Sequence, residues 1–164
     1  MFDGRRSVFE RKCTVKVLLA IDESRYSQAA LRAVIAQLRS DGTEVRVLNV
    51  VDWPADLPES LEFTPGALAS GPVMSIRDDA RRLSEQLLVR TAEQLRAAGF
   101  SVSHEMREGD PRHVILQCAG EWQPDVIVLG SHGRTGLDRF LLGSVAENVV
   151  RHASCSVAII RGGR

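Results

Sequence analysis

Short continuous apolar runs alternate along the chain with longer stretches in which apolar residues recur every three or four positions. The short runs predict strands buried on both faces, and the helical spacing predicts amphipathic helices. Five strands are expected, over residues 14–21, 43–51, 100–107, 124–130 and 155–161. Because helices separate the strands, the pattern predicts a single-domain α/β fold, an open parallel five-stranded sheet with helices on both faces.

Four helices are expected between these strands. Ser24 is predicted to cap the first helix and Gly42 to end it. The second is expected over about residues 73–98, and four positions spaced four apart are predicted to share one face: Leu83, Leu87, Thr91 and Leu95. Asp110 would cap the third helix, and the fourth would end near Ala153.

Two segments fall outside this alternation. Residues 1–13 precede the first strand and are expected to form an N-terminal extension, so that the domain covers residues 14–164. Residues 52–72 contain four prolines, at positions 54, 58, 65 and 72, and predict a long variable loop. Irregular loops of that length inside a domain are often functional, but neither segment contains a motif that assigns it a role.

Charge and composition narrow the class of protein. Basic and acidic residues balance at 21 each, so no global field favours nucleic acid or a membrane surface as a partner. No apolar run approaches the roughly 20 residues that span a bilayer. Residues 1–12 lack the apolar core of a signal peptide, and we therefore expect a cytoplasmic protein. The only lysines, Lys12 and Lys16, precede the first helix, which excludes a P-loop kinase or ATPase.

The cysteines and histidines form no recognisable metal or redox motif. The three cysteines lie in or beside apolar segments and are interpreted as small buried residues: Cys13, Cys118 and Cys155. The four histidines never pair at ligand spacing, so no protein-built metal site is expected. His132 either donates a hydrogen bond to a phosphate or has a plain loop role, and both are favoured over acid–base catalysis.

A glycine pattern follows the clearest buried strand, with the spacing Gly130-x2-Gly133-x9-Gly143-Ser144. Glycine lets backbone N–H groups approach a polyanion, and it permits the positive φ that turns successive amides inward. The Gly-Ser pair precedes an amphipathic helix, whose free N-terminal amides and dipole favour an anion. The alternative is that these glycines serve only a sharp turn. Their position after a strand and before a helix favours a phosphate site.

Asp22 ends the first strand, where ligands of parallel sheets bind. Its carboxylate could accept hydrogen bonds from the hydroxyls of a ribose, or it could serve the turn beside Ser24. No glycine lies between the first strand and its helix, which argues against a dinucleotide-dependent dehydrogenase. Paired catalytic carboxylates and nucleophile motifs are also absent from the sequence, so an enzyme with fast turnover is not expected.

These residues carry a family likeness. The segments "VLLAIDES", "LNVVD", "GDP" and "DVIVLGSHGRTGLDRFLLGSVAENVVRHASCSVAIIR" resemble the universal stress proteins of the ATP-binding kind, over about residues 14–161. The ATP motif of that family, G-x2-G-x9-G-[S/T], is matched without a gap. The resemblance implies the strand order 3-2-1-4-5, ATP bound between the first and fourth strands, and a homodimer formed through the last strand, residues 155–161.

The resemblance also implies a set of contact residues. The backbone at Ala20 and Val50 would flank adenine, with Leu129 packed nearby, and Asp22 would hold the ribose. The phosphates, with a divalent ion such as Mg²⁺ shared among them, would be surrounded by six residues: Gly130, Gly133, Arg134, Gly143, Ser144 and Val145. Arg134 could equally be a solvated loop charge. Trp53 would either shield adenine or pack under the loop.

The function that the resemblance implies is an ATP-binding regulator of the stress response, in which nucleotide occupancy modulates the dimer or an unidentified protein partner. Two alternatives stay open. One is a dimeric adaptor with the same fold that works without nucleotide, and the other is a slow ATPase. The sequence does not decide between ATP, ADP and cyclic AMP.

Overall fold

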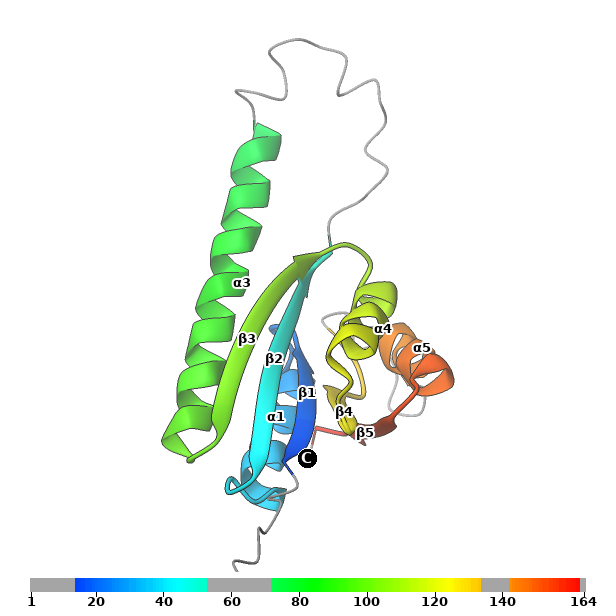
Figure 1. Cartoon of the computed structure of the whole chain (residues 1–164). Helices are drawn as coiled ribbons and strands as arrows, with labels where there is room; N and C mark the ends of the chain where they lie inside the picture. Colours follow the sequence, from blue (N-terminus) through cyan, green and yellow to red (C-terminus); the bar gives the residue numbers. More distant parts are fainter. Residues whose placement is uncertain (1–13, 53–71, 134–141, 163–164) are drawn as a thin grey trace, which may run out of the picture.

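The five predicted strands form one parallel sheet in a computed structural model that describes residues 14–52, 72–133 and 142–162, the side chains of 72–75 excepted. They are β1 (Val15–Ile21), β2 (Thr43–Val51), β3 (Ser101–Glu108), β4 (Val126–Gly130) and β5 (Ser156–Ile160). Their order in the sheet is β3-β2-β1-β4-β5 (Figure 1). The predicted fold class and strand order are therefore confirmed.

The central strand explains why the apolar runs are continuous. β1 pairs with β2 on one side and with β4 on the other, and three consecutive side chains in it, Val17, Leu18 and Leu19, are fully buried. A strand covered on both faces needs apolar residues at every position rather than at alternate ones. The two outer strands, β3 and β5, each pair on one side only among the described residues.

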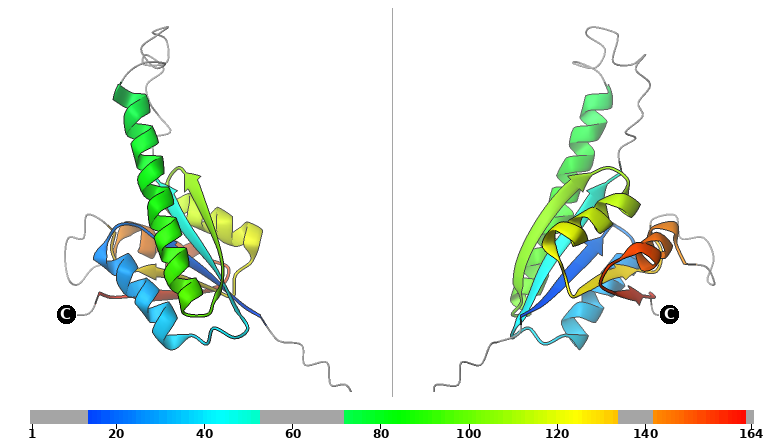
Figure 2. Two further views of the ribbon diagram at one scale, coloured as in Figure 1. Left: turned by 90° about the vertical axis from the view of Figure 1, so that its left-hand side faces the viewer. Right: turned by 45° about the vertical axis from the view of Figure 1, so that its right-hand side comes forward.

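Four helices cover the two faces of the sheet. They are α1 (Arg25–Gln37), α3 (Pro72–Ala97), α4 (Pro111–Trp122) and α5 (Ser144–His152). In Figure 2, α1 and α3 lie on one face and α4 and α5 on the other. Each pair buries its own hydrophobic cluster: Leu31 and Leu88 belong to the first, and Ile115 and Val149 to the second.

The predicted helix caps are present, but one helix ends earlier than expected. Ser24 Oγ accepts a hydrogen bond from the Ser27 amide, and Asp110 accepts one from the Arg112 amide. Gly42 does not end α1, which stops at Gln37, and that prediction was wrong. Gly42, with φ of 79°, instead supplies the left-handed residue of the turn that enters β2.

The predicted face of the second helix was partly wrong. Leu87, Thr91 and Leu95 are buried, but Leu83 is 48% exposed. Each step of four residues turns about 40° beyond a full helical turn, so a line of such steps drifts away from the core. Ser84, one position further along, points inward in place of Leu83 and is 5% exposed.

Some predictions lie outside the described residues. These concern the extension over residues 1–13, nearly all of the loop over residues 52–72 including Trp53, and the phosphate contact of Arg134. The division of the chain into extension and domain therefore stays a prediction. Within the described ranges, none of the helices combines the length and the apolar character needed to cross a membrane.

Candidate functional site

Three segments meet where β1 and β4 end. The loop after β4 is tied to the start of α5, because the Gly143 amide donates to the Ser131 carbonyl at 2.8 Å. The same loop reaches the start of α1 through a longer hydrogen bond of 3.5 Å from Ser24 Oγ to the His132 carbonyl. Asp22 therefore shares one corner of the sheet with the N-terminus of α5 and with the loop that follows β4, whose described residues 131–133 are called the glycine loop below.

The two carboxylate oxygens of Asp22 face different groups. Its Oδ1 accepts hydrogen bonds from Ser27 Oγ at 2.6 Å and from the Ser24 amide at 3.0 Å. Its Oδ2 lies 3.2 Å from the position that a Cβ would occupy on Gly133. One oxygen therefore serves the turn into α1, the alternative weighed from sequence, while the other faces the glycine loop.

Gly130, Gly133 and Gly143 are required for close approach rather than for special backbone angles. None has a positive φ, so the expectation that a positive φ turns the amides inward is wrong for them. A Cβ on Gly130 would lie 2.8 Å from the backbone carbon of Tyr26, closer than folded proteins allow. A Cβ on Gly143 would lie 3.2 Å from the Ser131 carbonyl oxygen. The absence of a side chain at Gly130 thus lets α1 pack against β4. Its absence at Gly143 lets the loop after β4 approach the start of α5.

The N-terminus of α5 lies at this corner, and among the described residues its first turn has no side-chain cap. Gly143 is the N-cap residue and offers no side chain to accept hydrogen bonds from the first-turn N–H groups. Ser144 is exposed and Val145 is half-buried. Because the dipole of a helix places partial positive charge at its N-terminus, this arrangement suits an anion.

The apolar candidates lie together beside this corner. Ala20 and Leu129 are paired across β1 and β4 and are almost fully buried, whereas Val50 and Val145 are half-buried. All four belong to or pack against the hydrophobic cluster on the face covered by α4 and α5. The structure therefore brings together the apolar residues, Asp22 and the glycine loop, while Arg134 lies outside the described residues.

Sequence reasoning missed the importance of Asn49. Its Nδ2 donates to the Ile21 carbonyl at 2.6 Å, and its Oδ1 accepts from Ser84 Oγ at the same distance. A signal was available, because Asn49 alternates in phase with the buried Val45 and Val47 and so had to lie in the core.

His132 and the two described cysteines are the remaining side chains with reactive groups that were considered from the sequence. His132 packs against Tyr26 with ring centroids 5.0 Å apart, and its Nδ1 lies 3.1 Å from Ser131 Oγ, which suits the loop role. Burial raises the pKa of the Cys118 thiol and so keeps it in its unreactive protonated form. Cys118 is buried as predicted, whereas the predicted burial of Cys155 was only partly right because it is half-buried. Cys13 lies outside the described residues.

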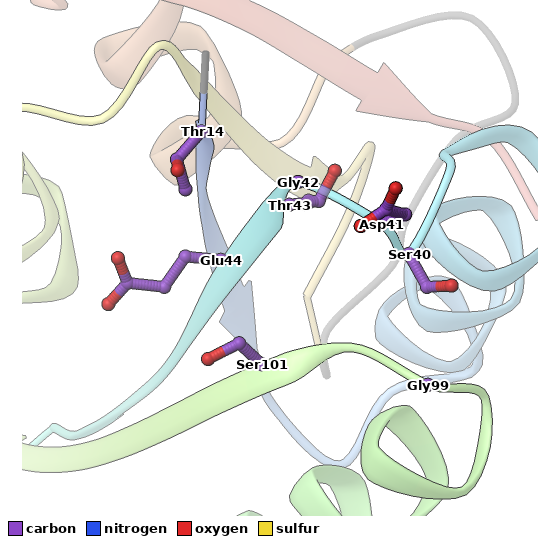
Figure 3. Close-up of a pocket in the computed structure, with 8 residues that line it drawn as sticks. All are labelled: Thr14, Ser40, Asp41, Gly42, Thr43, Glu44, Gly99 and Ser101. Carbon is purple, nitrogen blue, oxygen red and sulfur yellow. The ribbon is translucent and has the colours of Figure 1, made fainter. Parts of the chain in front are cut away.

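A hollow of about 460 Å³ lies at the opposite end of the sheet (Figure 3). It is formed around the starts of β1, β2 and β3 and is lined by Thr14, Ser40, Asp41, Gly42, Thr43, Glu44, Gly99 and Ser101. None of the predicted site residues belongs to it. Two of its lining residues, Asp41 and Glu44, have carboxylate side chains.

Comparison with known proteins gives consistent results. The model of the Universal stress protein family matches residues 15–161. The chain is 30% identical over 146 residues to universal stress protein MJ0531 of Methanocaldococcus jannaschii, covering 89% of this chain and 81% of that protein. The solved structure of hypothetical protein MJ0577 from the same organism is similar with a TM-score of 0.76 at 27% identity, covering 91% and 96% of the two chains.

A family protein from Arabidopsis thaliana, solved with AMP bound, shares the fold. Its TM-score is 0.64 at 22% identity, and the match covers 91% of this chain and 92% of that one.

Proposed function

Because the chain belongs to the universal stress protein family, we propose that it binds an adenine nucleotide, ATP or a close relative, at the carboxyl ends of β1 and β4. In this proposal Asp22 accepts hydrogen bonds from the ribose hydroxyls. Adenine lies against Ala20, Val50 and Leu129. The phosphates lie among the backbone amides of the glycine loop and of the first turn of α5, with Gly130, Gly133, Arg134, Gly143, Ser144 and Val145 around them.

The observation that carries the proposal is the contact between Asp22 and Gly133. A carboxylate oxygen faces a residue with no side chain, 3.2 Å from where a Cβ would lie, so a substituent there would intrude on the carboxylate. The start of α5 is joined to the same loop through the Gly143 amide. One acceptor for hydroxyls and several donors for an anion, set side by side, suit a ribose joined to phosphates.

The AMP-bound protein from Arabidopsis thaliana supports the proposal at the level of the fold. A sheet of this architecture accommodates an adenine nucleotide in that protein. The proposal for this chain therefore depends on its own residues at the corner, and on Asp22 and Gly133 above all.

We propose a regulatory rather than a catalytic use of the nucleotide. Fast phosphoryl transfer needs a positioned base or water-orienting group, and His132 is turned against Tyr26. A divalent ion such as Mg²⁺ would be held mainly by the phosphates and would reduce their charge. The outer strand β5 would pair with a second copy, because an unpaired strand edge offers free N–H and C=O groups. Since β5 pairs with β4, occupancy would be sensed at the dimer edge.

The test is titration of nucleotide-stripped protein with ATP and, separately, with inorganic tripolyphosphate, in the wild type and in Asp22→Ala. Loss of hydrogen bonds to a charged group is expected to weaken ATP binding about tenfold or more. Tripolyphosphate, which has no ribose, should bind Asp22→Ala no more weakly than wild type, because the substitution removes a negative charge beside the phosphates. Equal loss for the two ligands would contradict the role of Asp22. Absence of ATP binding to folded wild type would favour the nucleotide-independent adaptor.

A further inference from the structure

We propose that Asn49 and Ser84 are positioning residues for the nucleotide site, although neither belongs to the predicted contact set. Together they fix the peptide bond that precedes Asp22 and so the direction of its carboxylate. The proposal rests on the proposed function for its effect on affinity. Its structural part, the link from α3 to Asp22, can be tested without nucleotide.

The peptide bond between Ile21 and Asp22 is held at both ends by side chains. Its carbonyl oxygen accepts from Asn49 Nδ2 at 2.6 Å, and its N–H donates to Ser27 Oγ at 2.9 Å. The pairing of β1 with β2 ends at Ile21. Beyond this point side chains replace the hydrogen bonds of the sheet, and they determine how the chain leaves it.

The peptide is coupled to the carboxylate through one hydroxyl. Ser27 Oγ accepts from the Asp22 amide and also donates to Asp22 Oδ1 at 2.6 Å. With Oδ1 engaged, Oδ2 is the oxygen directed at Gly133. A rotation of the peptide would therefore change both hydrogen bonds of Ser27 and move the oxygen that faces the glycine loop.

Ser84 fixes the orientation of the Asn49 amide. The Ile21 carbonyl can only accept, so the amide nitrogen must face it and the amide oxygen must point the other way. That oxygen accepts from Ser84 Oγ at 2.6 Å. Asn49 and Ser84 are only 8% and 5% exposed, so water competes little for these groups and the loss of either partner leaves a buried group unsatisfied.

This network connects α3 to the site across the sheet face that carries α1. Ser84 lies 35 residues from Asn49 in sequence, within the helix that Figure 1 shows beside β3. Thr91 provides the contrast on the same helix. It is also buried, but its hydroxyl donates at 2.8 Å to the Leu87 carbonyl of its own helix. Of these two hydroxyls, Ser84 alone links α3 to Asp22.

The first experiment measures amide hydrogen exchange by NMR in wild type, Ser84→Ala and Thr91→Val, without nucleotide. Exchange at the Asp22 and Ser24 amides should be about fivefold to tenfold faster in Ser84→Ala, the factor expected for loss of one buried hydrogen bond. Thr91→Val removes a buried hydroxyl from the same helix and should leave both amides unchanged relative to the core. Equal effects of the two variants would overturn the proposal.

The second experiment compares ATP with 2′,3′-dideoxy-ATP, which lacks both ribose hydroxyls. Ser84→Ala should weaken ATP about fivefold to tenfold and leave the dideoxy analogue unchanged, because the effect passes through Asp22 to the ribose. Asn49→Asp keeps the acceptor for Ser84 but removes the donor to Ile21, and it should act in the same direction. Equal weakening of both nucleotides would overturn the positioning role. Failure of wild type to bind ATP would contradict the proposed function, and the exchange measurement would still decide the link to Asp22.

Discussion

Two glycines at the amino end of the sheet and three at the corner of β1 and β4 are required for different reasons, while Gly109, with φ of 129°, serves the turn after β3. At the amino end, Gly42 and Gly99 have φ values of 79° and 91°, which few other residues adopt, so they serve the turns beside the hollow. At the carboxyl end, Gly130, Gly133 and Gly143 have no such angles. There the absence of a side chain lets α1, Asp22 and the loop after β4 approach one another.

The hollow and the proposed nucleotide site lie at opposite ends of the sheet. The amino end has the hollow, and none of the described residues that line it is a predicted site residue. The carboxyl end has the start of α5, where the helix dipole is positive, and the Asp22 oxygen that faces Gly133. The hollow therefore lies away from the corner at which we propose that the nucleotide binds.

The largest effect should come from Gly130→Ala. Its Cβ would lie 2.7 Å from Tyr26 Cβ and 2.8 Å from the Tyr26 backbone carbon, so α1 must move away from β4. Overpacking of this kind should lower the free energy of unfolding by about 3 kcal/mol. Gly120→Ala in α4 is the matched control, because no described atom outside its own helical turn lies within 4 Å of the new methyl group. Chemical denaturation measures both, and similar stabilities would show that Gly130 is not a close-contact glycine.

A smaller effect is expected for Gly99→Ala at the amino end. An alanine at φ of 91° is strained, and its Cβ would lie 3.1 Å from Ser40 Oγ. The cost in stability should be about 1–2 kcal/mol, the usual penalty for a left-handed residue other than glycine. ATP affinity should not change, since the nucleotide is proposed to bind at the other end. A weakened affinity in the folded variant would break the distinction between the two ends.

The smallest effect is expected on the free energy of unfolding at acid pH, through Asp110, which lies just after β3. Hydrogen bonding to Arg112 holds the pKa of Asp110 at about 2, below its ordinary value of 3.8. A lowered carboxyl pKa stabilises the fold above pH 4, and this contribution is lost as the pH falls toward 2. The variant Asp110→Asn tests this contribution, because it keeps a good helix cap but removes the charge.

Above pH 4 this variant should be less stable than wild type by under about 1 kcal/mol, the range of exposed ion pairs. Denaturation at a series of pH values should show the difference vanish near pH 2, and a difference that grows there would contradict the sign.

The strands could be predicted because a parallel sheet covered on both faces leaves continuous apolar runs such as residues 15–21. Helix boundaries were less predictable. Gly42 seemed to end α1, yet the helix stops at Gln37 and residues 38–42 form the connection to β2. Leu83 shared the spacing of the buried face but drifts out of it as the helix turns.

The candidate site could be predicted only in part. Asp22 and the glycines were found because their chemistry is local in sequence. The Asn49–Ser84 contact joins residues 35 positions apart, and each side chain alone resembles an ordinary polar residue. The requirement for a glycine at position 130 could not be predicted either, because the contact with Tyr26 exists only after α1 packs against β4.

The most direct test of the account is calorimetric titration of nucleotide-stripped wild type, Gly133→Glu and Gly133→Gln with Mg-ATP. The account predicts that wild type binds, and that the glutamate, set beside Asp22 Oδ2 in the proposed phosphate site, abolishes measurable affinity while circular dichroism shows an intact fold. Glutamine, of the same size but neutral, should weaken binding less. Wild-type affinity in Gly133→Glu, or no binding to folded wild type, would contradict the account and leave the glycines with a purely structural role.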